Sequence, residues 1–190
     1  NIANIASNLA SITSLEDQNL NSGTNSCWGS DACYSIVNTA GEQNTAVGKS
    51  ALGATGGIGR TANTAIGHVS LGNLTNGSSN TAIGDEAGRH LTQGDGNVFA
   101  GKNAFIHQSS GSYNVAIGLQ ALGKYGTAET NTNGRNANYS VALGYQALYS
   151  NNANNPQNNN IAIGYQAGMN SEGDNNVFIG INLPFKKSEG

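Results

Sequence analysis

The sequence predicts an all-β chain that folds as a parallel β-solenoid, or β-roll, of about nine rungs. Three observations lead to this fold class: a five-residue unit recurs along the chain, side-chain types alternate inside the unit, and glycines stand where turns must join one unit to the next. A unit this short cannot bury an apolar face alone, so stacked units must share one continuous core. The expected shape is a rod.

The recurring unit reads Asn, then Thr or Val, then Ala, then Ile, then Gly. Copies of it, some with substitutions, begin at residues 25, 44, 63, 80, 97, 114, 140, 160 and 176, so the steps between starts are 19, 19, 17, 17, 17, 26, 20 and 16 residues. Self-similarity at a nearly constant period is the signature of a repeat architecture. The repeat defines a domain over residues 25–183.

The alternation inside the unit predicts where its side chains point. The second and fourth residues are usually β-branched or aliphatic and the third is usually Ala, which is the two-residue period of a short β-strand. We expect the branched residues to fill the interior of the coil and the alanines to face a neighbouring chain. The expected interface residues of this kind are Ala46, Ala65, Ala82, Ala116, Ala142 and Ala162.

Each unit is followed by a segment that must return the chain to the next unit. Two variable residues come first, then Ala and usually Leu or Phe, as in Ala51-Leu52, which predicts a turn and a second short strand. A glycine three residues before the next unit supplies the positive φ that a return turn needs. These glycines are Gly41, Gly77, Gly94, Gly111 and Gly173.

Residues 1–24 follow a different pattern. Their aliphatic side chains have the 3,4,3 spacing of a short coiled-coil seam, and Ile at both seam positions favours three or four strands over two. We therefore predict a homotrimer with an N-terminal trimeric coiled coil and neck, and a tail at residues 184–190. A single amphipathic helix packed on its own chain is the alternative. The seam residues, expected at the trimer interface, are Ile2, Ile5, Leu9 and Ile12.

Composition narrows the range of partners. The formal net charge is -3, and the eight Lys and Arg residues are scattered, whereas a nucleic-acid surface needs clustered positive charge. The longest apolar run is far shorter than the roughly 18 residues of a membrane span. We expect neither nucleic-acid binding nor membrane insertion.

The sequence offers little catalytic chemistry, so we do not expect an enzyme or a cofactor. Residues 48–50 read Gly-Lys-Ser, like the end of a phosphate-binding loop, but Gln43 stands where the pattern requires its first Gly. Asp85 and Glu86 are adjacent carboxylates, but they lie at variable turn positions, where a solvated turn explains them. Glycan hydrolysis would require two carboxylates held across the scissile bond.

The histidines and cysteines are the residues that could form a metal or redox site. His68, His90 and His107 lack zinc spacing, and we expect no metal, although His90 and His107 each follow their unit's Asn by ten residues and can stack on adjacent rungs. Cys27 and Cys33 occupy places where other rungs carry Ala and usually Leu. Two readings stay open for this pair: small core residues, or a disulfide that caps the first coil.

The longest step, from residue 114 to residue 140, contains nine more residues than its three predecessors, so an insertion must leave the solenoid before Tyr139. Insertions in repeat proteins often carry binding functions, and tyrosine rings with amide groups suit sugars. The predicted binding surface combines this insertion with two neighbouring turns; a loop without a ligand is the alternative. Its residues are Lys124, Tyr125, Asn131, Asn133, Arg135, Tyr139, Tyr145 and Tyr165.

Two segments, residues 140–148 and 160–168, resemble the Asn-Thr-Ala-Ile-Gly-Tyr-Gln-Ala-Leu repeats of phage and large-virus tail fibres. Residues 139–144 are also similar to the head repeats of trimeric autotransporter adhesins. The fibre resemblance, favoured by the 17-residue period, implies a homotrimer in a virion tail fibre that contacts a host cell-surface glycan or receptor and other fibre or virion proteins. The adhesin alternative implies the bacterial outer surface. A glycan-degrading tailspike and an ice-binding protein are less favoured.

Overall fold

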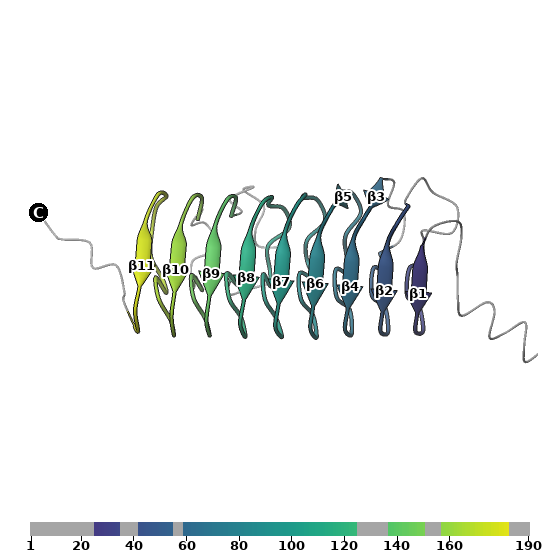
Figure 1. Cartoon of the computed structure of the whole chain (residues 1–190), viewed down its shortest axis with the longest axis horizontal. Coiled ribbons are helices and arrows are strands. Elements are labelled where there is room, and N and C mark those ends of the chain that lie inside the picture. The colour runs from purple at the N-terminus through teal and green to yellow at the C-terminus, as the bar shows by residue number, and fades with distance from the viewer. Residues whose placement is uncertain (1–24, 35–41, 55–58, 125–136, 151–156, 183–190) are drawn as a thin grey trace, which may run out of the picture.

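The computed structural model describes residues 25–34, 42–54, 59–124, 137–150 and 157–182, which form an elongated all-β solenoid (Figure 1). Nine three-residue strands make one parallel sheet, and two two-residue strands, β3 (Arg60–Thr61) and β5 (Gly77–Ser78), make another. The described residues contain no helix that could cross a membrane. The large sheet comprises β1 (Ser26–Trp28), β2 (Thr45–Val47), β4 (Thr64–Ile66), β6 (Thr81–Ile83), β7 (Val98–Ala100), β8 (Val115–Ile117), β9 (Val141–Leu143), β10 (Ile161–Ile163) and β11 (Val177–Ile179).

The strand positions confirm the parallel β-solenoid predicted from the repeat. Each of the nine copies of the unit carries one strand, and equivalent residues pair, as Thr45 does with Thr64. The register holds even across the longest step, where Val115 pairs with Val141. Extra residues between units therefore do not change the register of the sheet. The coiled coil of residues 1–24 and the tail of residues 184–190 lie outside the described residues, and the trimer stays a prediction.

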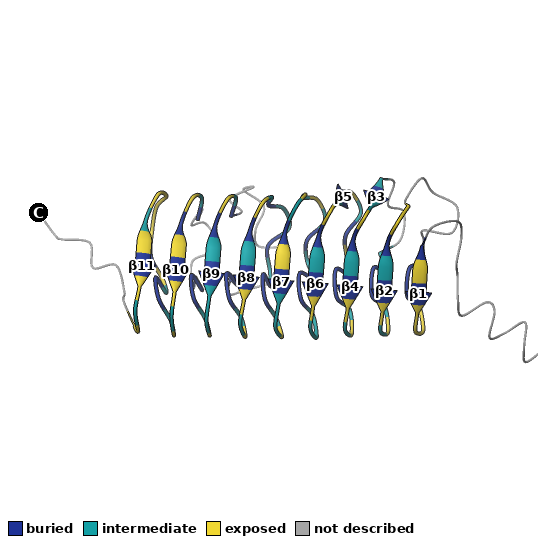
Figure 2. Ribbon diagram, viewed as in Figure 1, coloured by how far each residue is buried: buried dark blue, intermediate teal, exposed yellow. Residues whose placement is uncertain are grey.

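The alternation inside the unit is present, but its two faces are the reverse of the expected ones. In every strand the third residue of the unit is buried between two exposed or half-exposed neighbours (Figure 2). The coil is too narrow for branched side chains here, because leucine or phenylalanine from the ninth position, such as Leu52, already occupies the interior. The expected orientation of six alanines is thus wrong, since their own chain covers them completely: Ala46, Ala65, Ala82, Ala116, Ala142 and Ala162.

A ladder of buried asparagines runs beside the alanine column. The side-chain oxygen of Asn97 accepts hydrogen bonds from the backbone N–H and the Nδ2 of Asn114, at 2.9 and 3.1 Å. The Nδ2 of Asn97 donates to the carbonyl of Gly111 at 2.9 Å. In the one coil that lacks the Asn, the hydroxyl of Ser140 accepts from the backbone N–H of Asn160 at 3.1 Å. Because a buried polar group without a partner costs about 1–3 kcal/mol, each coil needs a side chain at this position that can accept a hydrogen bond from the next coil.

Three positions of the repeat adopt the left-handed conformation wherever the structure describes them: the residue before the unit, the seventh and the ninth. In the coil that starts at Asn44 they are Gln43, Ser50 and Leu52, with φ of 60°, 55° and 49°. Such backbone costs of order 1 kcal/mol or more per non-glycine residue, and hydrogen bonds to adjacent coils hold it. The N–H of Ser50 donates to Ser30 at 2.8 Å, and that of Leu52 donates to Ser70 at 3.0 Å. Ala51-Leu52 is consequently a turn rather than the second strand expected.

A disulfide between Cys27 and Cys33 closes the first coil, with 6.0 Å between the Cα atoms. Cys27 is fully buried and pairs in register with Ala46, while Cys33 occupies the column that Leu52 fills in the next coil. The two cysteines therefore do both things that the sequence left open: they fill core positions and they cross-link the end of the stack.

Candidate functional site

The outer face of the nine-stranded sheet exposes apolar side chains along the described solenoid. The second and fourth residues of each unit form it, and none of them is charged. The fourth residues are all apolar, and the second residues are Ser or Thr in the first four coils and Val or Ile in the later ones. Their exposed fractions include 38% for Ile66, 43% for Ile117 and 66% for Ile179. Contiguous apolar surface of this kind marks interaction sites in soluble proteins. We call it the outer face.

Two stacked tyrosine pairs flank the outer face on opposite sides. The rings of Tyr113 and Tyr139, just before β8 and β9, are 5.2 Å apart, and so are those of Tyr145 and Tyr165, just after β9 and β10. Three of these residues were predicted to bind a ligand, and all four are exposed. Tyr139 and Tyr145 lie beyond opposite ends of β9, so the sheet separates the two pairs.

Lys124, the first residue of the predicted binding surface, lies inside the solenoid. Only 1% of it is exposed, and burial lowers its pKa to about 8. Its backbone N–H donates to the carbonyl of Ile106 at 3.0 Å, in the stack of coils. An exposed ligand surface therefore does not include it. Four other predicted residues, Tyr125, Asn131, Asn133 and Arg135, lie outside the described residues.

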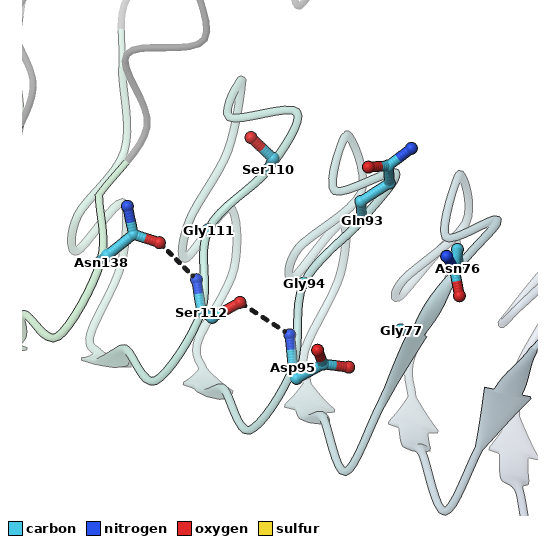
Figure 3. Close-up of a pocket in the computed structure, with 9 residues that line it drawn as sticks. All are labelled: Asn76, Gly77, Gln93, Gly94, Asp95, Ser110, Gly111, Ser112 and Asn138. Carbon is cyan, nitrogen blue, oxygen red and sulfur yellow. Dashed lines mark hydrogen bonds between the residues drawn. The ribbon is translucent and has the colours of Figure 1, made fainter.

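A polar groove of about 330 Å³, which the sequence analysis missed, crosses several coils (Figure 3). Three columns of residues line it, and each column advances by one coil at a time. Parallel bridges join Asn76 to Gln93 and Gln93 to Ser110 in the first column. Every lining residue is polar or glycine: Asn76, Gly77, Gln93, Gly94, Asp95, Ser110, Gly111, Ser112 and Asn138.

The middle column of the groove consists of glycines because the coils approach too closely for any side chain. At Gly94, where φ is 149°, an added Cβ atom would lie 2.1 Å from the carbonyl oxygen of Gly111. No real Cβ contact is that short, so a substitution would push the coils apart. The middle column therefore contributes backbone and no side chains to the lining of the groove.

The third column forms a second polar ladder. The backbone N–H of Ser78 donates to Oδ1 of Asp95 at 2.7 Å, that of Asp95 to Oγ of Ser112 at 3.0 Å, and that of Ser112 to Oδ1 of Asn138 at 3.0 Å. Figure 3 shows the last two of these bonds. Oδ2 of Asp95 makes no hydrogen bond or ion pair with the described residues. Asp, Ser or Asn two residues before the unit was the signal in the sequence.

The carboxylates considered for catalysis are held in surface ion pairs. Asp85 lies between side chains of the two adjacent coils, 3.0 Å from Nδ1 of His68 and 3.0 Å from Nζ of Lys102. The hydrogen bond from Lys102, followed by that from His68, lowers the pKa of Asp85. Glu86 pairs with Arg89 at 2.6 Å. A general acid needs a raised pKa, and the contacts of Asp85 act in the opposite direction.

His90 and His107 stack on adjacent coils, with ring centroids 4.7 Å apart. Burial, together with the positive charges of His107 and Arg89, lowers the pKa of His90 to about 4. Burial also lowers the pKa of His107. Within the described ranges no group of three or more His, Cys, Asp or Glu residues could hold a metal ion.

Comparisons with known proteins return no relative. No family model matches the chain, and neither the curated proteins nor the solved structures contain a match. Functional inference for this solenoid therefore rests on two of its surfaces, the outer face and the polar groove.

Proposed function

We propose that this chain is a rigid segment of a homotrimeric virion tail fibre that presents a glycan-binding surface to the host cell. The observation that carries the proposal is the uncharged outer face, which extends over all nine strands. At about 4.8 Å per strand the rod is on the order of 40 Å long, and an apolar stripe of that length is poorly solvated on a single chain. Three rods around a shared axis would cover one another's stripes.

The edge of the outer face supports assembly in the C-terminal half of the rod in particular. The sixth residue of each unit stands at this edge, where Asp85 and Lys102 form ion pairs in earlier coils. From the coil that begins at residue 114 onward the same column is apolar or aromatic, with Leu119 at 44% exposure, then Tyr145 and Tyr165. These tyrosines continue the apolar surface, so we assign them to the subunit interface rather than to a ligand site.

Sedimentation of the full chain tests the assembly. The wild type is expected to sediment at three times its 19.4 kDa chain mass. Ile117→Asp should shift it to a folded monomer, because this side chain is 43% exposed and lies outside the core. Asn73→Asp, a change at an exposed position away from the outer face, is the matched control and should leave the trimer intact. A stable, folded wild-type monomer at micromolar concentration contradicts the assembly.

Attachment to host cells and to glycan arrays tests the second half of the proposal. We propose that the insertion that precedes Tyr139 in the sequence contributes to this attachment, since Tyr139 and its stacking partner Tyr113 are exposed, at 61% and 56%. Deleting residues 126–134 should leave the trimer folded, because the sheet keeps its register across this step, and should reduce attachment. Unchanged attachment would exclude the insertion as a binding element.

A further inference from the structure

We propose that the polar groove binds a linear, uncharged oligosaccharide that lies parallel to the rod axis. The inference rests on the host-surface binding proposed above and names the ligand class and the site. Three kinds of observation support it: unused hydrogen-bonding groups, the charge of the lining, and the spacing of the coils.

The groove presents hydrogen-bonding groups that the described protein leaves unused. The side-chain amides of Asn76 and Gln93 make no hydrogen bond with the described residues, and neither does Oδ2 of Asp95. A primary amide donates and accepts at once, and a carboxylate accepts, which matches the paired donor and acceptor roles of sugar hydroxyls. Figure 3 shows Asn76 on one coil and both Gln93 and Asp95 on the next.

The lining also selects against negative charge. Asp95 is the one ionisable residue among those that line the groove, and no Lys or Arg is present. Sialic acid, uronic acids, sulfate and phosphate are bound through cationic side chains, and here they would instead meet a carboxylate of the same sign. A neutral glycan avoids this repulsion and can use Oδ2 of Asp95 as an acceptor.

The spacing of the columns suits a polymer of repeating sugars. Each column advances by about 4.8 Å per coil, which is close to the length of one pyranose unit, so consecutive sugars would meet equivalent groups. The ring of Tyr113 is not part of this site, because it lies between Gly96 of the preceding coil and the stacked ring of Tyr139 in the next coil.

An extended peptide fits this site less well than a glycan. Peptides that lie along β-structure usually add to a free strand edge. The backbone of the groove is already engaged in the coil stack, through the bridges from Asn76 to Gln93 and from Gln93 to Ser110. The groups that remain are side chains, and they are polar.

The test is binding of the full chain to neutral hexasaccharides (cello-, malto- and chitohexaose) and to anionic ones (hyaluronan and alginate hexamers). We expect at least one neutral hexasaccharide to bind, and we expect the double variant Asn76→Ala/Gln93→Ala to lower its affinity at least tenfold. Asn73→Ala removes an exposed amide outside the groove and should change nothing. Asp95→Asn keeps the Oδ1 acceptor for the N–H of Ser78. It should reduce the difference in affinity between neutral and anionic hexasaccharides.

Each other outcome has a distinct meaning. Binding of anionic hexamers alone, or neutral binding that the groove variants leave unchanged, overturns the groove as the site while host-surface binding stands. If no hexasaccharide binds but the chain still attaches to host cells, the inference about the ligand fails and the proposed function survives. If attachment to cells is absent as well, both fail.

Discussion

The ring of Phe99 fills the space that Gly88 leaves in the preceding coil. A Cβ atom added to Gly88 would lie 2.8 Å from Cδ2 of Phe99, and one added to Gly168 would lie 2.6 Å from Cδ2 of Phe178. In both places Phe replaces the usual Ala at the third position of the unit, and Gly replaces the usual Leu at the ninth position one coil earlier. Core volume is thus conserved between neighbouring coils rather than within each coil.

Transplanting this exchange tests it. Ala142→Phe alone should overpack the core and cost about 1–3 kcal/mol in the free energy of unfolding. Leu122→Gly, one coil earlier, should leave a cavity and cost about 2–5 kcal/mol. The double variant reproduces the Gly88 and Phe99 pairing and should lose at least about 1 kcal/mol less than the sum of the single losses. Urea unfolding of the four proteins measures the coupling, and additive losses would contradict the pairing.

Replacing one asparagine of the ladder should destabilise the solenoid according to what the substitute can accept. Asn97→Ala leaves two donors of Asn114 and the carbonyl of Gly111 without their partner, at about 1–3 kcal/mol each. Asn97→Ser should cost less, since the hydroxyl of Ser140 takes the same role in its own coil. Unfolding free energies of the two variants provide the comparison. Equal losses of stability would show that side-chain shape, and not hydrogen bonding, determines which residue this position requires.

Reduction of the disulfide should loosen the first coil and little else. The bond closes a short loop, for which the loss of chain entropy predicts roughly 2 kcal/mol of local stability. Hydrogen exchange of residues 26–33 should therefore accelerate in reductant while later coils keep their protection. Cys27→Ala with Cys33→Leu restores the residues of the neighbouring coil and should be insensitive to reductant. Protection that survives reduction in the wild type would mean that packing alone holds this coil.

Acid should weaken the coils that contain the stacked histidines. Folding lowers the pKa of His90 from 6.5 to about 4. Between these two pH values the unfolded chain therefore binds a proton at His90 that the folded chain does not bind. This contribution to stability is complete above about pH 6.5 and falls as the pH decreases toward 4. His90→Asn carries the amide that Asn73 places in the same column and should show a smaller fall in melting temperature between pH 7.5 and 4.5. Identical pH profiles would rule out His90 as the group responsible.

The repeat made the strand positions predictable, because Asn and Gly bracket each strand at a constant distance. It did not reveal which face is buried, since a strand that alternates Ala with Ile can turn either residue inward. The free volume inside the coil determines which face of the strand is buried. Leucines at the ninth position, such as Leu71, which lie outside the strand, occupy most of that volume. The sequence therefore predicts the alanine column on the outer face, whereas the structure places it in the core.

The two polar ladders and the position of Lys124 were harder to foresee for a related reason. Asn, Asp and Ser are common in turns, and only stacking shows that Asn97 and Asp95 bond to the coils beside them. The sequence predicts Lys124 to be part of the insertion because the extra residues begin near it. Its distance from the unit's Asn is the same as that of His107, which would have placed it in the stacked column.

In-register pairing across unequal steps means that the solenoid measures length in whole coils. Removing residues 80–96 would bring Phe99 onto Leu71 with no glycine beneath it, whereas removing residues 80–113 would bring Ala116 onto Leu71, a contact of the ordinary kind. The second deletion shortens the rod by about 10 Å, two spacings of a parallel sheet. The length of the rod can therefore change in evolution only by whole coils. Where a glycine and a phenylalanine are matched, it can change only by two coils at a time.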